Sequence, residues 1–287
     1  MKRILVTGAT GNVGRQVVSQ LLATDVRVRA LIRNPDAAGL PPEVERVRGD
    51  LTVPATLDGC LDGVDAMFLV WSAPPGAALA AMDRMTKQAR RIVFLSSPHR
   101  TPHPFFQASQ PNPVAALHAE IERLIEASGL PWTFLRPGMF AANALSWWAP
   151  QIRAGDVVRW PYLDAPTAPT DERDLAAAAV CMLCEDRHAG AEYVVTGPQS
   201  LTQAEQVHII GRATGKLLRV EEMSPDAARS ELLPVLGTPT FVNMLLNAWA
   251  AAIGQPAFVT STFAELTGAR PRSFLEWATD HAAEFRA

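Results

Sequence analysis

Residues 5–14 read LVTGATGNVG, with three glycines at intervals of three between an apolar run and a stretch of helical periodicity. The first glycine permits a sharp turn, the second lets the backbone approach a pyrophosphate, and the third lets the helix pack tightly on the strand. The helix start then offers free N–H groups and the positive end of its dipole to phosphates. Glycines also make plain tight turns, but this position between a first strand and an amphipathic helix is the context that the motif requires. We therefore predict a dinucleotide-binding loop with contacts from Gly8, Thr10, Gly11, Asn12, Val13 and Gly14.

Apolar runs and helical stretches alternate through the N-terminal half of the chain. Two runs, Ala66–Trp71 and Arg91–Ser96, are nearly continuous in apolar residues, as expected for strands covered on both faces. The alternation predicts an α/β protein with a Rossmann-type doubly wound parallel sheet and right-handed crossovers. The predicted strands are Arg3–Thr7, Val26–Ile32, Val44–Val47, Ala66–Trp71, Arg91–Ser96 and Thr133–Leu135, and the first predicted helix is Asn12–Ala23.

The second half of the chain is less regular. It contains two helical stretches, Asp171–Cys184 and Thr202–Thr214, with a strand at Tyr193–Thr196 between them. We expect one structural unit with two parts. Residues 1–150 form the Rossmann core, completed by later segments near 171–197, and residues 151–287 form mainly a small C-terminal α/β lobe that binds substrate.

The composition excludes several classes of protein. The chain of 287 residues is 48% hydrophobic, so a large core is expected, and its formal charge of −3 comes with scattered Lys and Arg, unlike the basic patch of a nucleic-acid-binding protein. The apolar segment Phe241–Ile253 is interrupted by Asn243 and Asn247 and is too short and too polar to span a bilayer. Because residues 1–3 lead straight into a strand, no secretory signal is expected. We expect a cytoplasmic monomer or homodimer whose partner is a small-molecule substrate, with no nucleic acid and no membrane.

The cysteines and histidines do not predict a metal site. Cys181 and Cys184 form a CxxC, but the sequence has no second pair, and they lie in an alanine-rich helical stretch. We interpret them, with Cys60, as buried or half-buried thiols and not as metal or redox groups. Prolines separate His99 from His103 and forbid a helical ligand pair, so no metal is expected.

The end of the second predicted strand indicates which dinucleotide binds. Residues 30–33 read ALIR, with no Asp or Glu to bind a ribose 2′-hydroxyl and with Arg33 in that place. A guanidinium suits a 2′-phosphate, which favours NADP(H) over NAD(H), although an arginine here is also typical of a solvated loop. After the third predicted strand, Asp50 and Leu51 are expected beside the adenine.

Several motifs together resemble one known family. They are VTGATGNVG (6–14), LIRNP (31–35), GDL (49–51), HAEIERLIEASGLPWTFLRPGMF (118–140), RDLAAAA (173–179) and YVVTGP (193–198), and they cover nearly the whole length. On these motifs the chain resembles the NmrA-like atypical short-chain dehydrogenase/reductases, and it is similar within them to the type 2 NAD(P)H:quinone reductases. The resemblance implies a Rossmann core, a small α/β lobe and a cofactor laid across the carboxyl edge of the strands.

The chain also departs from the pattern that the resemblance implies. Short-chain dehydrogenases typically use a Tyr as proton donor and a Lys four residues later, which assists the Tyr and holds the ribose. At the matching positions this chain has Val114 and His118, and its only tyrosines are Tyr162 and Tyr193. Carbonyl reduction or sugar-nucleotide epimerisation through that Tyr is therefore not expected. Quinone reduction tolerates the loss, because formation of the aromatic product drives the hydride transfer.

His118 is the candidate catalytic residue. Its helix is expected to begin at Pro113 after an Asn112 cap, with His118 at the edge of the apolar face, one turn before Glu122, which can orient its ring. A lone histidine at such a position is commonly a packed core residue. The resemblance, however, places it toward the nicotinamide, where it either holds the ribose or supplies a proton after hydride transfer.

Further candidates follow the predicted strands. Ser72 and Ser96 are cofactor-binding candidates at the edge where ligands bind, or else they cap turns. By the resemblance, Pro137 lies beside the nicotinamide as a cofactor contact, and Phe140 and Asn143 lie there as substrate contacts. Aromatic residues are expected either to wall a flat substrate pocket or to fill the lobe core: Phe105, Phe106, Trp147 and Trp148.

These observations lead to two hypotheses of different classes. The first is an NADPH-dependent reductase that transfers hydride to a quinone, an enone or a similar conjugated small molecule. The alternative is a non-catalytic NADP(H)-binding redox sensor, which the missing Tyr and Lys also fit.

Overall fold

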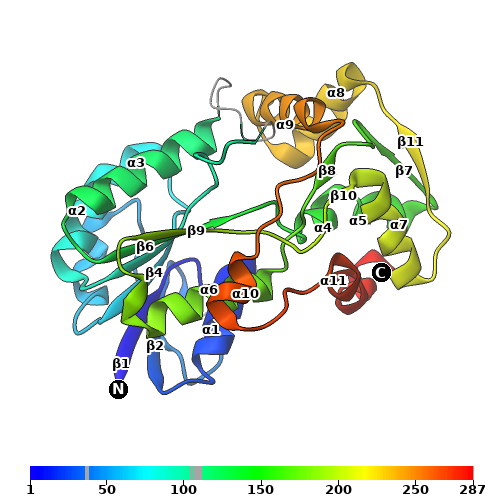
Figure 1. The fold of residues 1–287 in the computed structure, drawn as a ribbon. Helices are drawn as coiled ribbons and strands as arrows, with labels where there is room; N and C mark the ends of the chain where they lie inside the picture. The colour runs from blue at the N-terminus through cyan, green and yellow to red at the C-terminus, as the bar shows by residue number, and fades with distance from the viewer. Residues whose placement is uncertain (36–38, 104–105, 107–111, 287) are drawn as a thin grey trace.

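The structure is a computed structural model that describes residues 1–35, 39–103, 106 and 112–286. Within these residues, seven parallel strands form one sheet in the order β3-β2-β1-β4-β5-β6-β9 (Figure 1). The order reverses between β1 and β4, which is the switch point of a doubly wound sheet. The predicted Rossmann-type α/β fold is therefore confirmed. The strands are β1 (Lys2–Val6), β2 (Val26–Ile32), β3 (Glu45–Arg48), β4 (Ala66–Val70), β5 (Ile92–Leu95), β6 (Trp132–Pro137) and β9 (Ala191–Val195).

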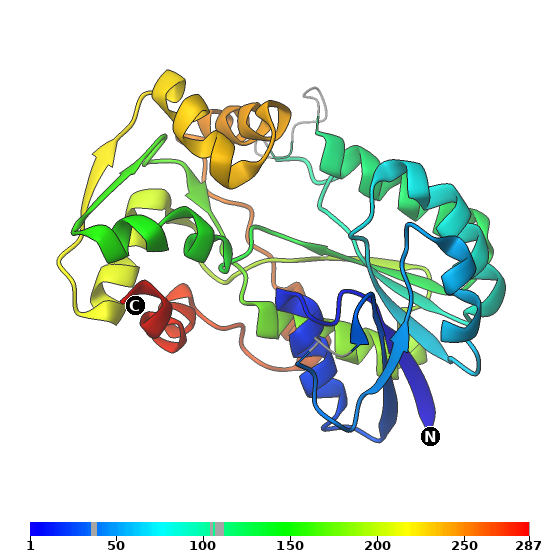
Figure 2. The ribbon, with the colours of Figure 1, turned by 180° about the vertical axis from the view of Figure 1, so that it is seen from behind.

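Helices cover both faces of this sheet, as the two opposite views show (Figures 1 and 2). On one face α1 (Asn12–Leu21) packs beside α6 (Glu172–Cys184). On the other face α2 (Ala78–Gln88) packs beside α3 (Pro113–Ala127). Both faces of the strands are therefore buried, which explains their continuous apolar runs.

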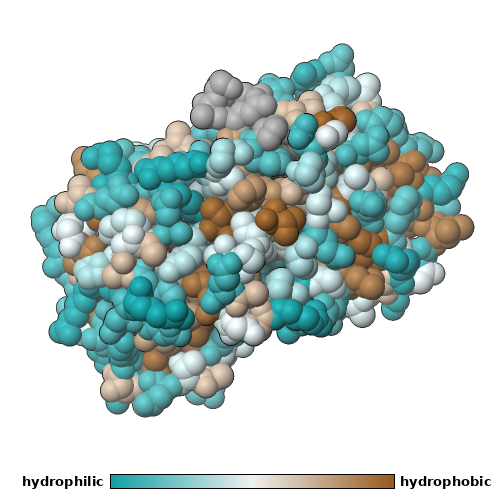
Figure 3. All heavy atoms as spheres, in the orientation of Figure 1, coloured by the Kyte–Doolittle hydropathy of each residue, from teal (hydrophilic) through white to brown (hydrophobic). Residues whose placement is uncertain are grey.

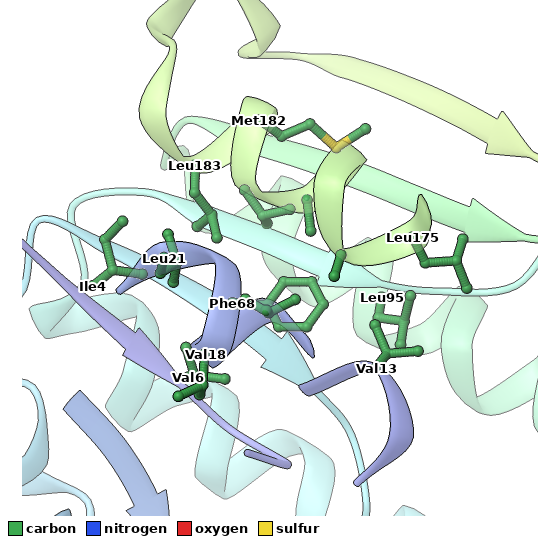
Figure 4. Packing of buried hydrophobic residues seen from close by; sticks show 14 of the residues in the cluster. Ile4, Val6, Val13, Val18, Leu21, Phe68, Leu95, Leu175, Met182 and Leu183 are labelled. Carbon is green, nitrogen blue, oxygen red and sulfur yellow. The ribbon is translucent and has the colours of Figure 1, made fainter. Parts of the chain in front are cut away.

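Successive residues of β1 enter two different cores. Ile4 and Val6 lie under α1 and α6, fully buried in one cluster with Phe68 and Met182 (Figure 4). Leu5 points to the opposite face and is buried in the cluster beneath α2 and α3. This alternation is the two-residue period of a strand, and it sets the register of the sheet between its helical layers.

Most of the remaining elements form a lobe beyond the carboxyl ends of the strands (Figure 1). The lobe holds a parallel pair, β7 with β11, and an antiparallel pair, β8 with β10. Its elements are α4 (Asn143–Trp147), α5 (Ala149–Ala154), β7 (Val157–Trp160), β8 (Pro166–Thr167), β10 (Leu201–Thr202), α7 (Gln203–Thr214), β11 (Arg219–Glu222), α8 (Pro225–Leu236), α9 (Pro239–Ala252) and α11 (Phe274–Asp280). Short 3-10 turns are Pro54–Thr56, Asp58–Cys60, Pro75–Ala77, Asp186–His188 and Ala282–Phe285.

Tryptophans fill the centre of the lobe. Trp147, Trp148, Trp160 and Trp249 are buried in one cluster, with contacting ring centroids 5.6 to 6.0 Å apart. Rings of this size supply much of the apolar area that a small lobe needs for a core of its own.

The chain passes between the two parts several times. After β6 it enters the lobe, and it returns for α6 and β9. After α9, residues 253–261, here called the strap, run back beside the sheet to α10 (Thr262–Thr267) (Figure 1). Thr260 ties the strap to the end of β9, because its N–H donates to Thr196 Oγ1 at 3.0 Å and its hydroxyl donates to Val194 O at 2.9 Å.

The predicted elements lie within two residues of the observed ones. Two helices, α6 and α7, begin one residue later than predicted, because the first predicted residue of each is its N-cap. Thr202 accepts a hydrogen bond from Glu205 N and Asp171 accepts one from Arg173 N. Among the described residues, no helix has both the length and the apolar character that crossing a membrane requires.

Candidate functional site

The glycine loop lies at the switch point and requires its glycines. Gly8 has φ of +61°, and a Cβ there would lie 2.9 Å from Val70 Cβ on the neighbouring strand. A Cβ on Gly14 would lie 2.1 Å from Gly8 O, so only a glycine lets α1 start this close to β1. Gly11 caps α1 without a side chain, which leaves the first amides of the helix open toward an anion.

The adenosine side of the site lies past β2 and β3. Arg33 is exposed directly after β2, where its guanidinium is available to a phosphate. Asp50 follows β3, and its Oδ1 accepts from Thr52 N and Thr52 Oγ1, both at 2.8 Å. These hydrogen bonds from Thr52 lower the pKa of Asp50. Leu51 is buried in the core cluster beneath α2. The hydrogen-bonded turn therefore orients Asp50, whereas core packing orients Leu51.

The two candidate serines differ in their surroundings. Ser72 follows β4 and is exposed, whereas Ser96 follows β5 and is 3% exposed. The Ser96 hydroxyl donates to Glu122 Oε1 at 2.6 Å. Ser96 therefore belongs to a buried polar network, which the sequence did not predict.

Glu122 of α3 is the centre of that network and is fully buried. Arg136 of β6 donates two hydrogen bonds to its carboxylate, from Nε to Oε1 at 3.0 Å and from Nη2 to Oε2 at 2.8 Å. Arg136 Nη2 also lies 2.7 Å from Glu192 Oε2, and His99 Nε2 lies 3.4 Å from Glu122 Oε2. Burial by itself would lower the pKa of Arg136, but its hydrogen bonds to Glu122 and the charges of Glu122 and Glu192 raise it.

His118 lies beside this network without joining it. Its ring meets Phe94 edge-on at 5.5 Å, and its buried Nδ1 has no hydrogen-bond partner among the described residues. The expectation that Glu122 orients the ring is wrong, because the carboxylate of Glu122 is bound by Ser96 and Arg136 instead. Burial lowers the pKa of His118 to about 4, helped by the charge of His99 and opposed by Glu122. At neutral pH the ring is therefore uncharged.

An aromatic cleft opens beyond the ends of β6 and β9. The space between its walls, open solvent included, is about 320 Å³. Its walls come from the segment after β6, the segment after β9, the β8 region, the loop after β5 and the strap: Gly138, Met139, Thr196, Pro166, Thr167, Ala168, His103, Phe106, Ala257 and Phe258. His103 joins two of these walls, because its Nε2 lies 2.9 Å from Pro256 O of the strap. Figure 3 shows a mostly polar face on which apolar side chains gather near the middle, where the sheet meets the lobe.

The predicted substrate residues fall in different places. Trp147 is buried in the tryptophan cluster of the lobe. Of the two places expected for it, a pocket wall or the lobe core, it occupies the core, and it does not line this cleft. Phe140 is half-buried against the core beneath α1, and Asn143 is half-buried with its Nδ2 3.0 Å from Met139 Sδ. Phe106 lines the cleft, and Phe105 lies outside the described residues. Pro137 ends β6, directly before the cleft residue Gly138.

Cys181 and Cys184 lie away from the cleft. Cys60 is buried, Cys181 and Cys184 are half-buried, and all are free thiols. Cys181, Glu185 and His188 have their polar atoms within 4.8 Å of one another near the amino end of β9, at the opposite edge of the sheet from the cleft.

A glycine loop at the switch point, an exposed arginine after β2 and a cleft past the strands define a dinucleotide-binding protein of the Rossmann class. Residues 8–148 match the profile of a family described as NAD(P)H-binding. The chain is also 40% identical to the (4-alkanoyl-5-oxo-2,5-dihydrofuran-3-yl)methyl phosphate reductase of Streptomyces griseus, over 98% of this chain and 99% of the relative. The chain therefore belongs to the NAD(P)H-binding family, within the NmrA-like atypical short-chain dehydrogenase/reductases.

Two further similarities agree with this assignment. The NAD(P)H azoreductase of Xenophilus azovorans is 32% identical over 99% of each chain. The crystal structure of the NADPH-dependent quinone oxidoreductase QOR2 of Escherichia coli in complex with NADPH shares the fold, with a TM-score of 0.78 and 24% identity over 96% of this chain and 99% of that one. The expected class, an NAD(P)H-dependent oxidoreductase, is confirmed, and so is its type of cofactor.

Proposed function

We propose that this protein is an NADPH-dependent reductase that transfers hydride to a conjugated small molecule, a quinone or an enone. The observation that carries the proposal is the aromatic cleft past β6 and β9. It faces the side of the switch point where a dinucleotide bound by the glycine loop would place its nicotinamide. Met139, Phe106 and Phe258 give the cleft apolar walls that suit a flat conjugated ring.

The relatives support a conjugated acceptor. The Streptomyces griseus relative is named for a dihydrofuranone ring whose carbon–carbon double bond is conjugated to carbonyl groups, and the Escherichia coli structure is named a quinone oxidoreductase. Both acceptors take a hydride at carbon or oxygen and move the negative charge onto a carbonyl oxygen. Such a reaction needs little acid catalysis, which fits a chain with Val114 where a Tyr would stand.

NADP(H) is the proposed cofactor form. Bound NADPH would supply the hydride. Arg33 would bind the 2′-phosphate, since it is exposed at the end of β2 and no carboxylate stands there to bind a 2′-hydroxyl. The open amides at the start of α1 would bind the diphosphate. The neutral imidazole of His118 would hold the nicotinamide ribose or the acceptor oxygen by a hydrogen bond.

The test is NADPH oxidation, followed by absorbance, with a benzoquinone, an alkanoyl-substituted dihydrofuranone and a saturated ketone as control. We expect turnover with at least one of the conjugated acceptors and none with the saturated ketone. If every conjugated acceptor failed at saturating NADPH while calorimetry still showed cofactor binding, the reductase proposal would be wrong.

The alternative is a binding-only redox sensor. Val114 and the unpartnered, uncharged His118 favour it, because neither supplies a strong acid at neutral pH. A sensor must distinguish the two redox states of its ligand. Calorimetry with NADP⁺ and NADPH would show clearly different affinities for a sensor, and equal affinities would count against it.

A further inference from the structure

The buried Glu122–Arg136 pair has no sufficient explanation in stability alone. Glu122 is fully buried and Arg136 is 2% exposed, so both lose most of their hydration on folding. Replacing a buried ion pair of this kind by well-packed apolar residues is often neutral for stability. Its place in the fold points to another role.

The pair lies at the carboxyl edge of the sheet, on the nicotinamide side of the switch point. Arg136 is the penultimate residue of β6, and Glu122 is one helical turn after His118 on α3. Since the glycine loop and Arg33 lie past β1 and β2, the ends of β5 and β6 face the other half of a bound dinucleotide.

Glu122 also holds the loop that follows β5. It accepts the Ser96 hydroxyl at 2.6 Å and faces His99 Nε2 at 3.4 Å, while His99 Nδ1 lies 2.9 Å from Ser97 O. A few residues later the same loop supplies His103 to the wall of the cleft. One carboxylate thus joins the helix that carries His118 to the loop that helps to wall the acceptor cleft.

The donor in the hydrogen bond between Ser96 and Glu122 is also determined. A carboxylate that accepts from a guanidinium has no hydrogen to give, so the hydrogen between Ser96 and Glu122 belongs to the serine. That hydrogen is not available to polarise a substrate carbonyl.

We propose that Glu122, held by Arg136, is a positioning residue that fixes α3 and the loop after β5 relative to each other, so that His118 and the cleft wall keep their places for hydride transfer. The turnover part of this inference rests on the proposed reductase function. Positioning matters because a displacement of about 1 Å far from the reacting atoms can cost roughly 100-fold in rate.

The first test is the apolar double variant Glu122→Met with Arg136→Met. We expect Tm to stay near that of the wild type, the Kd of NADPH to change by less than about threefold, and kcat to fall by roughly 10- to 100-fold. The matched control is Glu120→Gln with Arg123→Gln, an exposed pair on the same helix with a 2.7 Å contact, which should leave all three values unchanged. A folded Met–Met variant with wild-type kcat would refute the positioning role.

A second variant keeps the test decisive if the first does not fold. Ser96→Ala with His99→Gln leaves the Glu122–Arg136 pair intact and removes its contacts to the loop, together with the contact between His99 and Ser97 inside the loop. We expect the same fall in kcat at a Tm close to that of the wild type. An unchanged kcat would overturn the inference.

Hydrogen–deuterium exchange separates this inference from the proposed function. Either variant should raise amide exchange in residues 96–103 and 113–118, and the Glu120–Arg123 control should not. If the wild type reduced no acceptor, the proposed function would fail and the exchange result alone would decide the positioning role. Unchanged exchange in both variants would refute it.

Discussion

His118 lies on α3 with its Nδ1 buried and its ring against Phe94. Its residue type allows a proton donor near neutral pH, but burial favours the uncharged form so strongly that the imidazolium is absent there. Of the two roles that the sequence leaves open, the structure therefore favours hydrogen bonding over proton donation. Arg33 is the opposite case, since it is exposed and its proposed role depends on its charge.

The charge state of His118 can be measured directly. Because burial lowers its pKa to about 4, the ring should show no titration between about pH 6 and 8 in NMR spectra. His118→Ala should weaken NADPH binding by about 1 kcal/mol, the value of one neutral hydrogen bond, and His118→Gln should weaken it less. A ring that titrates near the ordinary histidine value would contradict the buried, uncharged assignment.

The role of Arg33 is tested by cofactor preference. Arg33→Gln removes a hydrogen bond to a charged phosphate, so we expect a loss of about 2 kcal/mol and a Kd for NADPH raised roughly 30-fold. The Kd for NADH, which lacks the phosphate, should stay nearly constant. Arg27→Gln, exposed near the other end of β2, is the matched control and should change neither value. An equal loss for both cofactors would show that Arg33 does not read the 2′-phosphate.

At the scale of elements, local sequence patterns explain nearly all of the positions where helices and strands begin and end. Asn112 caps α3 by accepting from Ala115 N at 2.9 Å, as its type and position before Pro113 predict. The apolar runs become strands because helices cover both faces. The buried pair is the exception. Arg136 is charged within the apolar run of β6, whereas Glu122 lies between the charged residues Glu120 and Arg123 on α3. The charge of Arg136 within a strand was the available signal for a buried pair, but the pattern does not tell which residue it meets.

The contact between β1 and α1 predicts the effect of one methyl group. In Gly14→Ala the new Cβ would meet Gly8 O at 2.1 Å, so α1 must move away from the strand. We expect a loss of about 1–3 kcal/mol in unfolding free energy, by urea titration, together with weaker NADPH binding. Gly76→Ala is the control, because nothing lies within 4 Å of its added Cβ. Wild-type stability and affinity in Gly14→Ala would show that the close approach is not needed.

At the scale of the whole molecule, α6 connects the sheet to the lobe. Its middle packs on the core, while its first turn contacts α11. Glu172 accepts from Trp277 Nε1 at 3.1 Å and pairs with His281 at 3.2 Å, and Asp174 accepts from Arg272 N at 2.7 Å. This part of the joint between sheet and lobe is therefore polar, and its titratable groups make it sensitive to pH.

His281 makes that sensitivity measurable. Its hydrogen bond to Glu172 raises its pKa above 6.5, against the effect of burial and with help from Glu284. A raised pKa in the folded state means that protonation stabilises the fold. The contribution is complete below pH 6.5 and is lost as the pH rises through the folded-state pKa. His281→Gln should therefore be less stable than the wild type by about 1.5 kcal/mol near pH 5.5, with the difference shrinking toward pH 9.

Urea denaturation at a series of pH values checks this expectation. His208→Gln, an exposed histidine of α7, is the control and should follow the wild type throughout. A difference between His281→Gln and the wild type that grew with rising pH would have the wrong sign and would contradict the Glu172 contact.

The order of strands and helices, the glycine loop and the arginine after β2 can be read from the chain, because each depends on neighbouring residues and their periodicity. The partners of Glu122, the uncharged state of His118 and the cleft walls cannot. Residues 96, 122 and 136 are separated in sequence and meet only when β5, α3 and β6 pack together, and the pKa of His118 depends on the burial that this packing creates. Trp147 shows the same limit, since its type suits a pocket wall and a core equally, and only the folded lobe decides between them.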